Sequence, residues 1–158
     1  MTLKKSLDRL LGGATMYRLV AIILTVLTGV AVVLSLVGVV FYSPLEILGS
    51  AVVLIATTML TSWIFGLLFR RPAHLESAAI TGYILLFVLE PSLELPDLLG
   101  LAAAGAIASA SKFILAIRGR HIFNPAAIAA LIVTVAGLQY AIWWVSTPGL
   151  LPFVAVGA

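Results

Sequence analysis

The sequence predicts an all-α integral membrane protein with five transmembrane helices, of which the third is short or broken. Of the 158 residues, 63% are hydrophobic and only 9% are charged, and the mean hydropathy is +1.23. A water-soluble domain needs more charge than this to cover its apolar surface. Five apolar runs, separated by charged residues and prolines, set the number of helices. We interpret the whole chain, 1–158, as a single membrane domain.

The first two expected helices are uncharged runs at 19–41 and 47–69, each long enough for a bilayer, which needs about 20 apolar residues. The basic start of the chain resembles a signal peptide, but the apolar run after it is too long for one, so we interpret it as a retained span. Pro44 separates the two helices, and Arg70-Arg71-Pro72 ends the second.

The third run, 77–89, lies between Glu76 and Glu90. As a helix it covers about 20 Å at 1.5 Å per residue, whereas the hydrocarbon core is about 30 Å thick. The fourth, 98–117, is rich in Ala, Gly and Ser, which allows a neighbouring helix to approach closely. The fifth, 124–145, begins at Asn-Pro and ends before a Pro-Gly turn.

The distribution of charge predicts the orientation. If the N-terminus is cytoplasmic and every run crosses once, all nine Lys and Arg residues fall on the cytoplasmic side, as the positive-inside rule requires. Five crossings leave the C-terminus outside, so a second five-helix copy would run upside down, as in inverted-repeat transporters. The apolar C-terminal end suggests a half-protein or truncated chain that pairs with a missing second half or with another copy.

The composition excludes several kinds of site. With no cysteine and two histidines, no disulfide, cysteine-ligated iron–sulfur cluster or metal site is expected. Topology accounts for the net charge of +3, so no nucleic-acid partner is inferred. No self-contained catalytic site is found, and we assign no catalytic residue.

The basic cluster before the fifth helix has two interpretations. It is either a short cytoplasmic loop, with Lys112 reaching the headgroups, or a binding site in which the amide end of the helix and basic side chains hold an anion or a flavin ring. Asn124 and Pro125 suit the helix start under both. The candidate cofactor-binding residues are Lys112, Arg118, Arg120, His121, Asn124 and Pro125.

The short third helix is a second candidate site. Glu76 and Ser77 either cap it or, with Thr81 and Gly82, form a broken-helix site in an ion or substrate pathway, because discontinuous helices build such sites in transporters.

The string "SKFILAIRGRHIFNPAA" resembles one family of membrane subunits, found in sodium-pumping NADH:quinone reductase and in the Rnf electron-transport complex, and "HLESAAITGYILLFVLEPS" and "TMYRLV" resemble other parts of that family. The similarity corresponds to the N-terminal half of a typical member. It implies one half of an inverted-repeat, urea-transporter-like fold that binds riboflavin or FMN non-covalently. Covalent attachment at Thr15 is not expected, because that threonine precedes the first helix.

Three functions are therefore considered. The first is a membrane subunit of a flavin-dependent, ion-coupled electron-transfer complex in the bacterial inner membrane, with a flavin/iron–sulfur reductase module as its partner. The second is a homodimeric transporter or channel for a small solute or a flavin. The third is a membrane anchor that docks a reductase.

Overall fold

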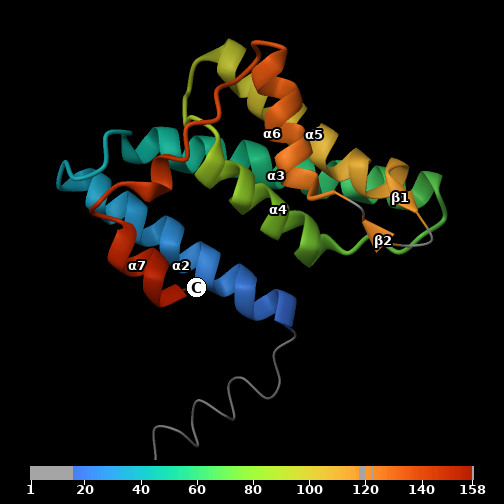
Figure 1. Cartoon of the computed structure of the whole chain (residues 1–158), viewed down its shortest axis with the longest axis horizontal. Coiled ribbons are helices and arrows are strands. Elements are labelled where there is room, and N and C mark those ends of the chain that lie inside the picture. The colour runs from blue at the N-terminus through green and yellow to red at the C-terminus, as the bar shows by residue number, and fades with distance from the viewer. Residues whose placement is uncertain (1–15, 118–119, 122, 158) are drawn as a thin grey trace, which may run out of the picture.

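The computed structural model describes residues 16–117, 120–121 and 123–157. The described part is mostly helical (Figure 1). Its elements are α2 (Met16–Leu36), α3 (Pro44–Leu68), α4 (Leu75–Val88), α5 (Leu95–Ile114), β1 (Ala116–Ile117), β2 (Arg120–His121), α6 (Pro125–Val135), the 3-10 turn η1 (Trp144–Ser146) and α7 (Leu151–Gly157). Within it, α2, α3 and α5 are long and apolar enough to cross a membrane, while α4 and α6 are shorter apolar helices.

α3 and α5 begin three residues earlier than the sequence predicts, because their prolines lie in the first turn and do not act as breakers. Pro44 is the first residue of α3, and Ser43 before it forms a capping box with Glu46. Pro96 lies in the first turn of α5. Proline has no backbone N–H, but an N–H in the first turn of a helix has no helical partner. Proline is therefore well tolerated there.

The expected fifth helix over 124–145 is wrong in its second half. α6 ends at Val135, and Gly137 follows with a φ of 68°. The N–H of Leu138 bonds to the carbonyl of Val133 at 2.9 Å, which completes a glycine-terminated helix end. The chain then runs through a non-helical segment, 138–143, into η1.

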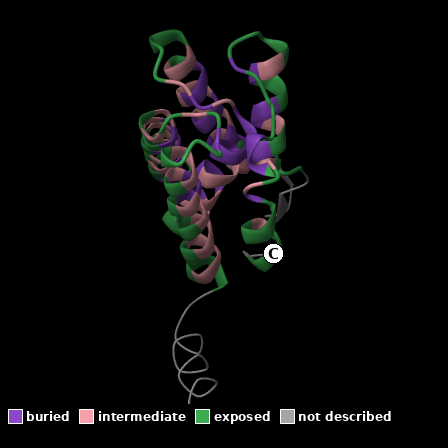
Figure 2. Ribbon diagram, turned by 90° about the vertical axis from the view of Figure 1, so that its left-hand side faces the viewer, coloured by how far each residue is buried: buried purple, intermediate pink, exposed green. Residues whose placement is uncertain are grey.

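Small residues bring α3, α4 and α5 close together, as the composition of the fourth run predicts. A β-carbon on Gly82 of α4 would lie 3.0 Å from the Ile55 Cα of α3. On the α5 side, Ser109 donates a 2.8 Å hydrogen bond to the carbonyl of Thr58. Contacts of this kind stabilise helix pairs in lipid, where the hydrophobic effect between helices is absent. Figure 2 shows the buried residues concentrated in the middle of the molecule.

The described charges separate to opposite ends of the bundle. α3 and α5 run parallel, as contacts at both ends show. Ser50 bonds to Ser92 near the N-terminal ends of the two helices, and Phe65 and Phe69 pack on Phe113 near their C-terminal ends. α4 runs the other way. The basic end holds Arg18, Arg70, Arg71, Lys112 and Arg120, with the acid Glu76, and the opposite end holds Glu46, Glu90, Glu94 and Asp97.

Candidate functional site

Two short helices and the chain that follows them form the candidate site. α4 and α6 both begin at the basic end, and their 14 and 11 residues cover about 21 and 16 Å at 1.5 Å per residue. Both are therefore shorter than a hydrocarbon core of about 30 Å. Non-helical segments, 89–94 and 138–143, follow them.

These two segments satisfy each other's backbone groups. Leu89 and Ala141 form an antiparallel bridge. The Glu90 N–H donates to the Tyr140 carbonyl at 3.0 Å, and the Ile142 N–H donates to the Val88 carbonyl at 2.9 Å. Non-helical backbone is tolerated at membrane depth only when its polar groups are paired within the protein. The pairing therefore allows both helices to stop where they do.

Two buried side chains complete the junction of α4 and α6, which is formed by the paired segments 89–94 and 138–143. The Gln139 amide donates to the Glu90 carbonyl at 3.3 Å and accepts from the Tyr140 N–H at 2.9 Å. The Trp144 indole donates to the Leu86 carbonyl at 2.6 Å. Gln139 and Trp144 are only 2% and 5% exposed. Neither role is predicted from the sequence.

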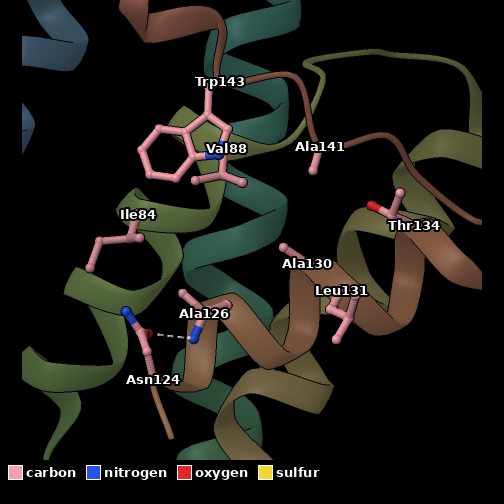
Figure 3. A pocket seen from close by; sticks show the side chains of 10 residues that line it. Ile84, Val88, Asn124, Ala126, Ala130, Leu131, Thr134, Ala141 and Trp143 are labelled. Atoms are coloured by element: carbon pink, nitrogen blue, oxygen red, sulfur yellow. Dashed lines mark hydrogen bonds between the residues drawn. The ribbon is translucent and has the colours of Figure 1, made fainter.

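A cavity of about 300 Å³ lies between α4, α6 and the segment 138–143 (Figure 3). Its walls are largely apolar, and only three lining side chains carry a nitrogen or oxygen: Asn124, Thr134 and Trp143. The lining residues are Ile84, Val88, Asn124, Ala126, Ala127, Ala130, Leu131, Thr134, Ala141 and Trp143. Ligand pockets commonly combine apolar walls with a few placed polar groups in this way.

Asn124 is the predicted residue that reaches this cavity. Its Oδ1 accepts a 3.0 Å hydrogen bond from the Ala126 N–H and so caps α6, with Pro125 as the first helical residue. The amide nitrogen then points away from the cap, toward Ile84 on α4 (Figure 3). Because Oδ1 is used by the cap, the side chain offers the cavity N–H donors.

Thr134, at the far end of α6, also lines the cavity and is not among the residues predicted from the sequence. Its Oγ1 is buried and has no hydrogen-bond partner among the described residues. By contrast, Thr25, Thr57 and Thr81 donate to the carbonyl four residues earlier at 2.7–2.8 Å. An unsatisfied buried hydroxyl costs about 1–3 kcal/mol. The only sequence signal for Thr134 is one hydroxyl in an apolar run.

The other predicted cofactor residues divide into two groups. Arg118 lies outside the described residues, as does Thr15, where no covalent attachment is expected. The backbones of Arg120 and His121 form β2, which pairs with Ile117 and Ala116 of β1, and their side chains lie outside the described part. The paired strands β1 and β2 lie between α5 and α6 in the chain and bring the backbones of Arg120 and His121 to the basic end, where α6 starts.

Lys112 lies with the residues of the third helix. Its ammonium group donates to the Ser77 carbonyl at 2.9 Å and to the Ser77 hydroxyl at 3.2 Å. The Thr81 hydroxyl donates to the same carbonyl at 2.8 Å. Ser77 and Glu76 also line a small cavity of about 280 Å³ with Tyr17 and His74. Lys112 thus links the end of α5 to the first turn of α4.

The sequence left open whether the third helix is short or broken, and the structure shows a short helix, since α4 is continuous from Leu75 to Val88 through Thr81 and Gly82. Gly82 is buried against α3 and Thr81 is bonded within its own helix. The glycine therefore provides close helix packing, and the discontinuity follows Val88, just before Glu90-Pro91.

At the acidic end, Tyr42 approaches Glu90. Its hydroxyl donates to the carboxylate at 3.4 Å, and burial together with Glu90 raises the pKa of Tyr42 to about 12. The phenol therefore remains a neutral donor at physiological pH. Among the described residues, no three His, Asp or Glu side chains are grouped so that they could hold a metal.

The chain thus has the features of a helical membrane protein in which two shorter helices end against paired, non-helical segments. No family model, curated protein or solved structure matches it.

Proposed function

We propose that this chain is a membrane subunit, or half of one, in a flavin-dependent, ion-coupled electron-transfer complex of the bacterial inner membrane. The cavity between α4 and α6 is the proposed site for the flavin ring. The observation that carries the proposal is the cavity itself, about 300 Å³ of largely apolar space. Its walls carry the Asn124 amide, the Trp143 indole and the Thr134 hydroxyl, which has no partner among the described residues. A flat, uncharged heteroaromatic ring with acceptors on its edge fits this chemistry.

Two further features support the proposal. The string that resembles the electron-transport subunits ends in Asn124-Pro125-Ala126-Ala127, and three of these residues line the cavity. The hairpin before α6 places the backbone of Arg120 at the basic end of the bundle, which is the cytoplasmic end in the proposed orientation. A reductase module would then approach from the same side.

An absorption spectrum of the detergent-purified protein, followed by titration with riboflavin and FMN, tests this function. We expect flavin absorbance, or else a rise in melting temperature on addition of flavin. A ligand at 100 times its Kd stabilises the folded state by about 2.7 kcal/mol. Ala127 lines the cavity with an exposed side chain, so Ala127→Trp should block binding at little cost to the fold. A protein without bound flavin, whose melting temperature neither flavin changes, would contradict the proposal.

The orientation is tested separately with introduced cysteines, because the natural sequence has none. Arg71 and Glu94 are exposed at opposite ends of the bundle. With the basic end cytoplasmic, a membrane-impermeant maleimide should label Glu94→Cys in intact cells and Arg71→Cys only after the membrane is opened. The reverse pattern would place the basic hairpin outside.

The junction of α4 and α6 also favours a second candidate, a homodimeric transporter of a small solute or a flavin. Discontinuous helices near the bilayer midplane build the substrate sites of many transporters, and here paired non-helical segments follow two short helices. Uptake of a solute such as riboflavin or urea into proteoliposomes without any reductant would favour this candidate. A strictly monomeric protein would count against the homodimer.

A further inference from the structure

The position of Thr134 predicts how a ligand lies in the cavity. Figure 3 shows its oxygen on the side that faces Ala130 and Ala141, and this oxygen is buried without a partner among the described residues. Thr147 Oγ1 is also buried without such a partner, but Thr147 does not line this cavity. Thr134 Oγ1 is therefore the hydroxyl that a ligand in the cavity would reach.

The two polar ends of the cavity differ in their surroundings. Asn124 is exposed and lies where α6 begins at the basic end, whereas the Thr134 hydroxyl is buried ten residues further along the helix. Ten residues of helix cover about 15 Å. Between them the walls are formed by Ile84, Val88, Ala130 and Leu131. An aromatic ring is best accommodated against these apolar walls, and a polyhydroxylated chain is best accommodated at the exposed rim.

We propose that Thr134 is a ligand-binding residue of this site, and that its hydroxyl donates a hydrogen bond to an acceptor on the edge of the flavin ring. The ring lies against the apolar walls beside the Thr134 hydroxyl, and the ribityl chain leaves past Asn124 at the basic end. This inference rests on the proposed function, and it assigns the direction in which the ligand enters.

A binding titration with two ligands distinguishes the Asn124 end of the cavity from the Thr134 end. The ligands are riboflavin and lumiflavin, which has the same ring without the ribityl chain. Thr134→Val removes the hydroxyl at nearly constant shape, and Thr134→Ser keeps it. We expect Thr134→Val to weaken both ligands to the same extent, by roughly three- to tenfold, the usual value of one hydrogen bond. Thr134→Ser should bind both ligands as the natural protein does.

Each other outcome of this experiment contradicts a different statement. Unchanged binding of both ligands by Thr134→Val would overturn the role of Thr134 while leaving the flavin site intact. Loss of riboflavin binding alone would show that the hydroxyl contacts the ribityl chain and would reverse the orientation. If the natural protein binds neither ligand, the proposed function fails and this inference fails with it.

The ligand-free protein provides an independent check. Removing a buried hydroxyl that has no partner should leave the melting temperature of Thr134→Val unchanged or slightly raised. A clear decrease would show that the hydroxyl is bonded within the protein, and it would overturn the proposal.

Discussion

Replacing Gly100 with alanine is expected to lower the free energy of unfolding by about 3 kcal/mol, at the upper end of the cost of overpacking. A β-carbon at Gly100 would lie 2.2 Å from the carbonyl oxygen of Leu138 and 3.0 Å from its carbonyl carbon. These are backbone atoms of the segment that pairs with 88–90, so they cannot move aside without breaking that pairing. Thermal unfolding in detergent measures the effect.

Gly29→Ala is the matched control for this substitution. Gly29 also lies inside a long helix, but its β-carbon would meet nothing within 4 Å. Alanine is favoured over glycine in a helix by up to about 1 kcal/mol, so Gly29→Ala should be neutral or slightly stabilising. Equal destabilisation by the two substitutions would show that the close approach of α5 to Leu138 is absent.

Replacing Gln139 with leucine is expected to cost about 3 kcal/mol, because it leaves two backbone groups unpaired in a buried environment. The leucine cannot accept from the Tyr140 N–H or donate to the Glu90 carbonyl, and each lost partner costs about 1–3 kcal/mol. Water is excluded from this position, since Gln139 is 2% exposed. Unfolding in detergent, combined with hydrogen exchange at the Glu90 and Ile142 amides, measures the change.

Tyr140→Phe is the control at the neighbouring position. The Tyr140 side chain is 61% exposed, and substitutions at such positions usually change stability by less than about 0.5 kcal/mol. Gln139→Leu should accelerate exchange at both amides, whereas Tyr140→Phe should not. If Gln139→Leu leaves exchange unchanged, the bridge between the segments does not depend on Gln139.

These two predictions also concern the cavity, because the segment 138–143 forms one of its walls through Ala141 and Trp143. Trp143 adopts a left-handed backbone conformation, with a φ of 50°. This conformation is uncommon for a bulky residue and costs on the order of 1–3 kcal/mol. The bond from its N–H to the Val88 carbonyl, 3.1 Å long, helps to hold it. If the cavity binds flavin as proposed, Gln139→Leu should therefore also weaken that binding.

Composition and local sequence were enough to predict the membrane class, the apolar helices and the charged ends of the bundle. The class follows from composition, because a chain with so few charges cannot cover itself in water. The prolines were correctly placed at boundaries, although Pro44 and Pro96 belong to the first turns of their helices. Asn124 was recognised as a cap because its side chain and the following proline act locally.

Long-range packing was needed to establish where α6 ends, where the discontinuity after α4 lies and which residues line the cavity. Residues 136–145 are as apolar as a membrane helix. Because a bilayer favours apolar side chains on helical and non-helical backbone alike, hydropathy does not distinguish the two conformations here. The non-helical conformation of 138–143 depends on partners far away in the sequence, chiefly Val88 and Glu90. The Thr134 hydroxyl, which has no partner among the described residues, was not predicted, because nothing in its local sequence distinguishes it from the threonines that bond within their own helices.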